Sequence, residues 1–373
     1  KLQVLLHSTC TFGLEHMLKV LLAACCCCSV THAEPVRLIL DTDLGGGGCM
    51  DVDDVGALCM SHALADNGEV QLLAVVQDTS PPLLAGAISV INHHYGRDVP
   101  VGAYKGSDLS PNAPFLPYVT DLVTHWPSPI ANATQVPSSV EVYRRTLAAQ
   151  PDHSVVISSI GLLTNLAELL RSEPDDHSSL GGIELVAQKV RLLAVMGGEY
   201  PSSGGEPKGC NFCGCVFGDD PGSAGAAAAA ASFVLSSIPG RVQVMFLGGS
   251  AGRSVQSGGR LASCAERGNP CRQAYLDYLA DPPIGPPTST RPSWDPLTTL
   301  AAVRGPEAVG CATCTDCDGR NRVDERTGSN QWVPGQPSNQ TYLVLKDAEA
   351  AAAAIDQLLC QAPQRPLPQG VVV

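Results

Sequence analysis

The segment that most constrains the fold is a mostly apolar run at residues 36–40 that leads into an acidic, glycine-rich stretch. The run predicts a buried strand, the glycines at 45–48 let the backbone turn, and residues 55–65 predict a helix. Acidic side chains therefore gather at one corner between a strand and a helix. They are Asp41, Asp43, Asp51, Asp53 and Asp54.

Carboxylates crowded at one corner repel each other unless a cation neutralises them, and hard oxygen ligands favour Ca²⁺ or Mg²⁺. We therefore predict a metal site at the carboxyl end of this strand. The alternative is a solvated acidic turn that caps the helix, because Asp is favoured both in turns and at N-caps. A solvated turn does not need two acids directly after an apolar strand, so the metal site is the preferred interpretation.

The chain continues as an alternation of strand and helix patterns. Strands are predicted at 70–76, from 100, and at 154–160, 190–196 and 242–247. Helices are predicted at 83–95, at 140–149, from Thr164 to 171, and from Asp220-Pro221 onward. This alternation predicts an α/β fold in one domain, with a mostly parallel twisted sheet covered by helices on both faces. Ligands of such sheets bind at the carboxyl ends of the strands.

Composition narrows the class of partner. The chain has 373 residues, 44% of them hydrophobic, and a formal net charge of −13. Because phosphate binding needs a basic face, this charge argues against nucleic acid polymers and anionic membranes. A nucleoside carries no phosphate and stays open as a small-molecule ligand. Homo-oligomers are not excluded.

Residues 14–33 place a basic residue before a short apolar run that ends in small residues. This pattern predicts a signal peptide over 1–33 with cleavage near Ala33, and hence a secreted or endomembrane, including vacuolar, protein. An uncleaved anchor or an artefact of the start is the alternative. The run is too short for a comfortable membrane span. The remainder divides into an α/β domain over 34–362 and a tail at 363–373.

Of the sixteen cysteines, five (Cys10 and Cys25 to Cys28) would leave with the signal peptide. In an oxidising compartment the rest are expected to form loop disulfides. Two groups have zinc-like spacing, Cys311 with Cys314 and Cys317, and Cys210 with Cys213 and Cys215. Neither has a matching second pair, so we favour disulfides over zinc. Glycosylation sequons begin at Asn132 and Asn339, in agreement with a glycoprotein on the secretory route.

Residues 41–45 (DTDLG) together with 51–54 (DVDD) resemble the N-terminal signature of the inosine/uridine-preferring nucleoside hydrolases. Residues 46–50 lengthen a loop in which that family has about one residue. Four later stretches extend the resemblance to roughly 35–360, namely 75–80, 158–166, 196–212 and 291–297. The resemblance implies the α/β fold of that family and hydrolysis of the N-glycosidic bond of ribonucleosides.

The resemblance also implies a set of site residues. Ca²⁺ would be bound by Asp43, Asp54, Asp295 and the backbone carbonyl of Thr164. Asp43 would in addition act as the general base that activates water. The sugar and base would be held by Asp53, Asp78, Glu206, Asn211 and Trp294. From residue type alone, Thr164 is only a helix start capped by Thr, and Asp78 could equally be a strand-end turn residue.

Three of these positions depart from the family pattern. Asp78 stands where the family has an Asn, and it cannot donate a hydrogen bond when ionised. About three extra residues separate Glu206 from Asn211. Trp294 stands where better-studied members have the His that protonates the leaving base, and Trp cannot supply a proton at neutral pH. It would either stack on a purine or pack the turn.

Two other functions compete with the hydrolase. A haloacid-dehalogenase-type phosphatase also uses Asp-x-Asp at a strand end, but Gly45 occupies the position where that motif has Thr or Val. A non-catalytic nucleoside- or sugar-binding homologue fits the missing His and the enlarged loop. We expect the hydrolase, with the binding protein as the main alternative.

Overall fold

The computed structural model describes residues 34–45, 51–106, 109, 116–201, 211–212, 221–283, 285–336 and 338–364. The segment predicted as a signal peptide, residues 1–33, lies outside the described residues, as do Glu206 and the cysteines at 210, 213 and 215. The unit Pro35–Val373 is described by itself below.

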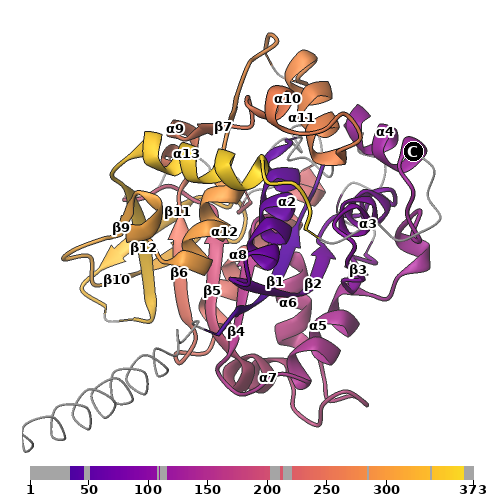
Figure 1. Cartoon of the computed structure of the whole chain (residues 1–373). Coiled ribbons are helices and arrows are strands. Elements are labelled where there is room, and N and C mark those ends of the chain that lie inside the picture. Colours follow the sequence, from indigo (N-terminus) through magenta and orange to yellow (C-terminus); the bar gives the residue numbers. More distant parts are fainter. Residues whose placement is uncertain are drawn as a thin grey trace, which may run out of the picture. The chain divides into compact units, whose positions relative to one another are not determined.

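An eight-stranded sheet with the order β3-β2-β1-β4-β5-β6-β12-β9 organises this unit (Figure 1). Its strands are β1 Val36–Thr42, β2 Val70–Gln77, β3 Val101–Ala103, β4 Val155–Ser159, β5 Val190–Met196, β6 Gln243–Leu247, β9 Cys311–Thr313 and β12 Gln340–Leu345. All neighbours pair in parallel except β12 and β9, which are antiparallel. The predicted α/β class and the predicted strands up to β6 are confirmed; β9 and β12 were not predicted.

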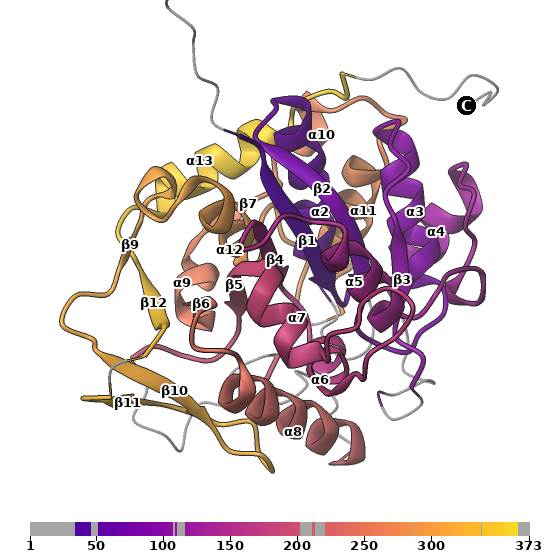
Figure 2. The same ribbon diagram turned by 90° about the horizontal axis from the view of Figure 1, so that it is seen from below.

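Helices cover both faces of the sheet, which leaves its strands buried and explains their continuous apolar runs. One face carries α2 Asp53–Asp66, α3 Leu84–His94, α4 Pro117–His125, α11 Pro270–Ala280, α12 Trp294–Arg304 and α13 Ala348–Leu359. The other face carries α5 Ser139–Ala148, α6 Thr164–Arg171, α7 Gly182–Lys189 and α8 Pro221–Ser237 (Figure 2). Along β1, Leu38 and Leu40 belong to the first core and Ile39 to the second.

Short elements complete the described chain. They are α9 Gly249–Ser254, β7 Gln256–Ser257, α10 Leu261–Cys264, β8 Arg291–Pro292, and a hairpin of β10 Gly319–Val323 with β11 Asn330–Pro334. There are also single 3₁₀ turns at Ala133–Gln135 and Glu307–Val309. The hairpin packs against α8 (Figure 2). Within the described ranges, every helix is too short or too polar to cross a membrane.

Two of the three disulfides among the described residues join elements that are distant in sequence. Cys59 of α2 pairs with Cys271 of α11, and Cys264 of α10 pairs with Cys360 after α13. Cys314 pairs with Cys317, while Cys311 is buried and keeps a free thiol. The preference for a disulfide over a zinc site is therefore confirmed at this triplet. By closing a long loop, the Cys59–Cys271 bridge restricts the unfolded chain and stabilises the fold.

Candidate active site

The sheet order 3-2-1-4-5-6 places a topological switch point between β1 and β4, where consecutive connections leave in opposite directions. The register pairs Asp41 of β1 with Val76 of β2 and with Ser159 of β4, so the carboxyl ends of these strands lie at one edge. Asp43 follows β1 and Asp78 follows β2 at this edge. Ligands of open α/β sheets bind at this position, and the acidic residues lie there.

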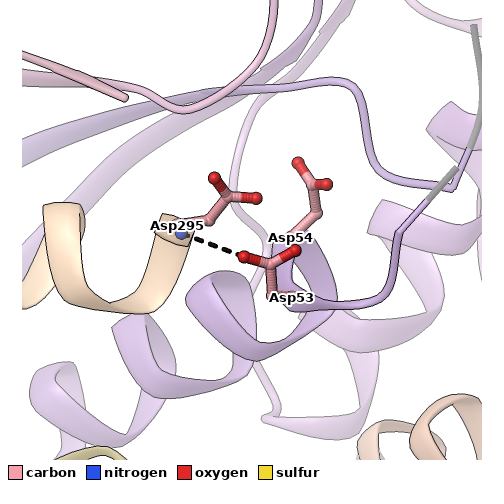
Figure 3. A group of neighbouring side chains, drawn as sticks. All are labelled: Asp53, Asp54 and Asp295. Carbon is pink, nitrogen blue, oxygen red and sulfur yellow. Dashed lines mark hydrogen bonds between the residues drawn. The ribbon is translucent and has the colours of Figure 1, made fainter. Parts of the chain in front are cut away.

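Three buried carboxylates converge beside this edge (Figure 3). Asp53 and Asp54 belong to the first turn of α2, and Asp295 belongs to the first turn of α12. One oxygen of each lies within 4.8 Å of the others. The two helices pack against each other, and their N-terminal ends carry partial positive charge that favours acidic groups. All three donors are hard oxygens, which suit Ca²⁺ or Mg²⁺.

Asp53 also connects the two helices directly. Its Oδ2 accepts hydrogen bonds from the backbone N–H groups of Trp294, at 2.9 Å, and Asp295, at 3.0 Å. The second of these bonds is drawn in Figure 3. Asp53 therefore satisfies two of the N–H groups that begin α12. The carboxylate predicted to hold sugar hydroxyls thus has a structural task as well.

Asp43 and Asp54 form the part of the cluster nearest to β1. The Thr42 hydroxyl donates to Asp54 Oδ1, and the Asp54 carboxyl contacts those of Asp43 and Asp295. Burial raises the pKa of Asp54 to about 6 despite the Thr42 hydrogen bond. Burial also raises the pKa of Asp43 well above its usual range, and the charges of Asp54 and Asp78 add to that shift. Asp43 Oδ2 is buried without a hydrogen-bond partner among the described residues.

These observations test whether a cation fits. Burial is the largest cause of the raised pKa values of Asp53, Asp54 and Asp295, and the charges of neighbouring carboxylates add to each of them. Burial of several ionised carboxylates together is unfavourable, and a divalent ion would offset this by neutralising their charges. The orphaned oxygen of Asp43 offers a further ligand atom. The donor set therefore fits Ca²⁺ or Mg²⁺. The alternative of a solvated acidic turn is wrong, because Asp53 and Asp54 are buried.

Asp41 does not join this cluster, although the sequence placed it at the same corner. Its carboxylate accepts from the Tyr143 hydroxyl at 2.7 Å and from Asn165 Nδ2 at 2.8 Å, which belong to α5 and α6 on the other face of the sheet. Burial raises the pKa of Asp41 to about 7, against those two hydrogen bonds. Asp41 therefore links β1 to α5 and α6 on the face of the sheet opposite to the cluster.

Asp78 is fully buried, and neither carboxylate oxygen has a hydrogen-bond partner among the described residues. Burial is the first cause of its raised pKa, followed by the charges of Asp41 and Asp54. A Cβ built on Gly161 would lie 2.2 Å from Asp78 Oδ2 and 2.7 Å from the backbone N of Asp43. Gly161 thus permits a close approach of three chain segments that any side chain would prevent.

Thr164 is the first residue of α6, but its side chain does not cap that helix. Its hydroxyl donates to the backbone carbonyl of Asp78 at 2.8 Å. The helix start lacks a side-chain cap hydrogen bond at Leu163. The simple interpretation of Thr164 as a capping residue is therefore wrong. The hydroxyl instead ties the chain after β4 to the chain after β2.

Asn211 and Trp294 both make structural contacts. Asn211 Nδ2 donates to the carbonyls of Ile160, at 2.8 Å, and Met196, at 3.0 Å, so it bridges the ends of β4 and β5. The Trp294 indole N–H donates to the Gly249 carbonyl at 2.7 Å, and its ring packs so closely on Gly252 that a Cβ there would lie 2.2 Å from it. These contacts favour the packing alternative for Trp294.

Sequence reasoning missed several residues of this region, most notably Arg291. Its guanidinium forms an ion pair with both oxygens of Asp51, which leaves Asp51 outside the three-carboxylate cluster. Tyr143 and Asn165 were missed as the partners of Asp41. None carries a local signal, because each acts on a residue more than one hundred positions away.

No family model and no curated protein sequence matches the chain. Solved structures do match. A plant nucleoside hydrolase, PpNRh1, aligns with a TM-score of 0.61 at 18% identity over 87% of this chain and 99% of its own. A purine-preferring ribonucleoside hydrolase from Gardnerella vaginalis gives 0.58 at 15% identity over 87% and 99%. The type III effector XopQ, solved with adenosine diphosphate ribose, gives 0.60 at 17% identity over 88% and 94%. The chain therefore has the nucleoside hydrolase fold, as the motifs implied.

Proposed function

We propose that this chain hydrolyses the N-glycosidic bond of ribonucleosides to free base and ribose. The observation that carries the proposal is the buried acidic cluster at the switch point of a nucleoside hydrolase fold, with Asp43 Oδ2 unpartnered beside Asp54. An acidic pocket suits this reaction because the transition state has oxocarbenium character, so positive charge develops on the sugar.

Asp43, Asp54, Asp295 and the carbonyl of Thr164 would hold the metal, which we propose to be Ca²⁺. When bound, the ion would lower the pKa of a water molecule and orient it. Asp43 would accept the proton of the attacking water as the water oxygen forms a bond to C1′. The bond from C1′ to the base nitrogen breaks, its electron pair passes to the base, and the leaving base takes a proton from solvent. Asp53 and Asp78 would accept hydrogen bonds from the sugar hydroxyls, with Glu206 and Asn211 as further sugar contacts.

Trp294 does not protonate the leaving base in this mechanism. Its indole N–H is committed to the Gly249 carbonyl, and it lies at the first turn of α12 as part of the wall next to Asp295. We assign it to the wall of the base pocket.

A second candidate is a binding protein for a ribose-containing ligand. It is favoured by the structural use of Asn211 Nδ2 and by the effector of the same fold that was solved with adenosine diphosphate ribose. The acidic cluster and the net charge of −13 disfavour a diphosphate ligand for this chain. An uncharged nucleoside is therefore the better ligand class.

The test is a base-release assay on the full chain with inosine, adenosine, guanosine, uridine and cytidine at saturating Ca²⁺. The hydrolase yields base and ribose and loses activity after EDTA. Affinity for a nucleoside without release of base would establish the binding protein instead. Full activity after exhaustive EDTA treatment, with no metal by elemental analysis, would refute the metal assignment.

We also propose a secretory route, which the three disulfides of the described residues support. The two sequons differ in the folded chain. Asn339 Nδ2, the atom that would carry a glycan, donates to the carbonyls of Val242 and Pro239. Asn132 instead uses its Oδ1 to cap a 3₁₀ turn. Asn132 is therefore the better glycan acceptor, which peptide mapping of secreted protein would check.

A further inference from the structure

Beside the acidic cluster lies an ion pair that the proposed mechanism does not use. Arg291 Nε donates to Asp51 Oδ1 at 2.6 Å, and its terminal nitrogen donates to Asp51 Oδ2. The guanidinium carbon lies 5.1 Å from the centre of the Tyr278 ring and 5.2 Å from that of Trp294. We call this pair, with its two flanking rings, the Asp51–Arg291 latch.

The latch is mostly shielded from solvent, and Asp51 is fixed from three sides. The side chains of Arg291 and Asp51 are 23% and 14% exposed. Asp51 Oδ1 also accepts from the N–H of Val52 at 2.7 Å, and the buried Tyr118 hydroxyl donates to the Asp51 carbonyl at 2.6 Å. A bidentate, partly buried ion pair holds its two side chains in one relative position far more firmly than an exposed surface pair does.

The two ends of the latch lie just before the two helices that carry the cluster. Asp51 precedes α2, which begins at Asp53, and Arg291 precedes α12, which begins at Trp294. The same two segments are joined a second time where Asp53 accepts from the first N–H groups of α12. Two links therefore set the separation of the helix starts, and that separation determines where the Asp54 and Asp295 carboxylates meet.

Electrostatics alone does not explain why an arginine lies beside the metal-binding cluster. The positive charge of Arg291 favours ionised Asp53, but it also repels any metal ion held by the cluster. A planar guanidinium has a second property, which is a rigid fork that matches both oxygens of a carboxylate. Lys keeps the charge and loses the fork, so the two properties can be separated by one substitution.

We propose that Arg291 is a positioning residue for the metal centre: through Asp51 it fixes the starts of α2 and α12 so that Asp54 and Asp295 converge on the ion. This rests on the metal centre of the proposed function. Removal of residues that orient metal ligands typically weakens metal binding roughly 10- to 100-fold. We therefore expect substitutions that break the latch to weaken metal binding by a similar factor.

The test compares Arg291→Lys with a matched control at the other end of the same helix. Arg304, the last residue of α12, makes an equivalent two-bond pair with Glu69, at 2.7 and 2.8 Å. Ca²⁺ affinity is measured by titration calorimetry on the full chain, and thermal stability is measured in EDTA. Arg291→Lys should weaken Ca²⁺ binding roughly 10-fold or more. Arg304→Lys should change it less than about twofold, because that pair lies at the end of α12 opposite to Asp295.

Three results would overturn the proposal. Unchanged Ca²⁺ affinity in Arg291→Lys, with only a lower melting temperature, would show a purely structural pair. Tighter Ca²⁺ binding in Arg291→Gln would show that charge repulsion outweighs positioning. Wild-type protein that binds neither Ca²⁺ nor Mg²⁺ would remove the metal centre itself, which is a failure of the proposed function and is distinguishable from the other two.

A second variant keeps the test informative if Arg291→Lys does not fold. Asp51→Asn retains the acceptor for the N–H of Val52 but loses the bidentate pair. If the latch acts as a unit, adding Arg291→Gln to Asp51→Asn should weaken Ca²⁺ binding little further. Additive losses in the double variant would contradict the latch.

Discussion

Replacing Gly161 by Ala would perturb the site without touching any charge. A Cβ at this position would lie 2.2 Å from Asp78 Oδ2, 2.9 Å from Asp78 Cγ and 2.7 Å from the backbone N of Asp43. Real Cβ atoms essentially never lie under 3.0 Å from a neighbour, so something must move. The Asp78 side chain is fully buried and the contact with Asp43 is to its backbone, so displacing either group costs free energy.

Overpacking of this kind costs about 1–3 kcal/mol. We expect Gly161→Ala to lower the free energy of unfolding by that amount, measured by urea denaturation in EDTA. Because the displaced groups are Asp43 and Asp78, Ca²⁺ affinity and kcat should fall as well. Gly225→Ala in α8 is the matched control, since a Cβ there meets nothing within 4 Å. It should stabilise the protein by about 0.4–1 kcal/mol, because Ala loses less backbone entropy on folding.

The reasoning is refuted if Gly161→Ala retains wild-type stability and wild-type Ca²⁺ affinity. Such a result would mean that the chain segments after β1, β2 and β4 are not in the close approach on which the site geometry depends. A loss of stability with unchanged Ca²⁺ affinity would refute only the link between Gly161 and the metal.

Three further predictions concern the site, and a fourth concerns the cysteines. Asp43→Asn should lower kcat roughly 10²- to 10⁴-fold at saturating Ca²⁺ while leaving the melting temperature in EDTA close to or above that of the wild type. In the folded, metal-free protein the pKa of Asp54 is about 6 and that of Asp41 about 7, above the ordinary 3.8, so the folded state retains protons that the unfolded chain has released. Stability in EDTA should therefore fall as pH rises from about 4 to about 7, and saturating Ca²⁺ should reduce that fall by the share of Asp54, since Asp41 is not a proposed ligand. A rise in EDTA would contradict the buried cluster. Trp294→Phe, which loses the bond to the Gly249 carbonyl, should cost about 1 kcal/mol of stability, whereas a rise in KM confined to purines would show stacking instead. Thiol titration of denatured, unreduced protein should find few free thiols, and a majority of free cysteines would contradict the secretory route.

The positions of the catalytic candidates could be predicted because a parallel sheet aligns the carboxyl ends of its strands. Asp43, Asp78 and Thr164 each follow a strand whose apolar run is visible in the sequence. Once these runs are assigned to neighbouring parallel strands, their following residues must share one edge. The motif near Asp295 adds the remaining acid through α12.

The partners of these residues could not be predicted in the same way. Both faces of β1 are apolar and buried, so its alternation does not reveal that Asp41 faces α5 and α6. The hairpin was missed for a related reason. Its buried positions include Asn321 and Asn330, which are polar and are satisfied by Tyr200 and by the backbone of Glu199. A strand with buried Asn residues does not show the alternation of apolar residues that indicates a half-buried strand.

The acids of the first motif look equivalent in the sequence, and the structure separates them by their partners. Asp51 is neutralised by Arg291, Asp53 accepts from the start of α12, and Asp41 is held from behind by a hydroxyl and an amide. Asp54 has one such bond, from the Thr42 hydroxyl. Asp43 keeps a buried oxygen without any partner among the described residues. A buried, unpaired carboxylate is costly, so a site that retains one needs an ion or a substrate to complete it. That requirement falls on Asp43, which is also the residue to which the proposed mechanism assigns the proton of the attacking water.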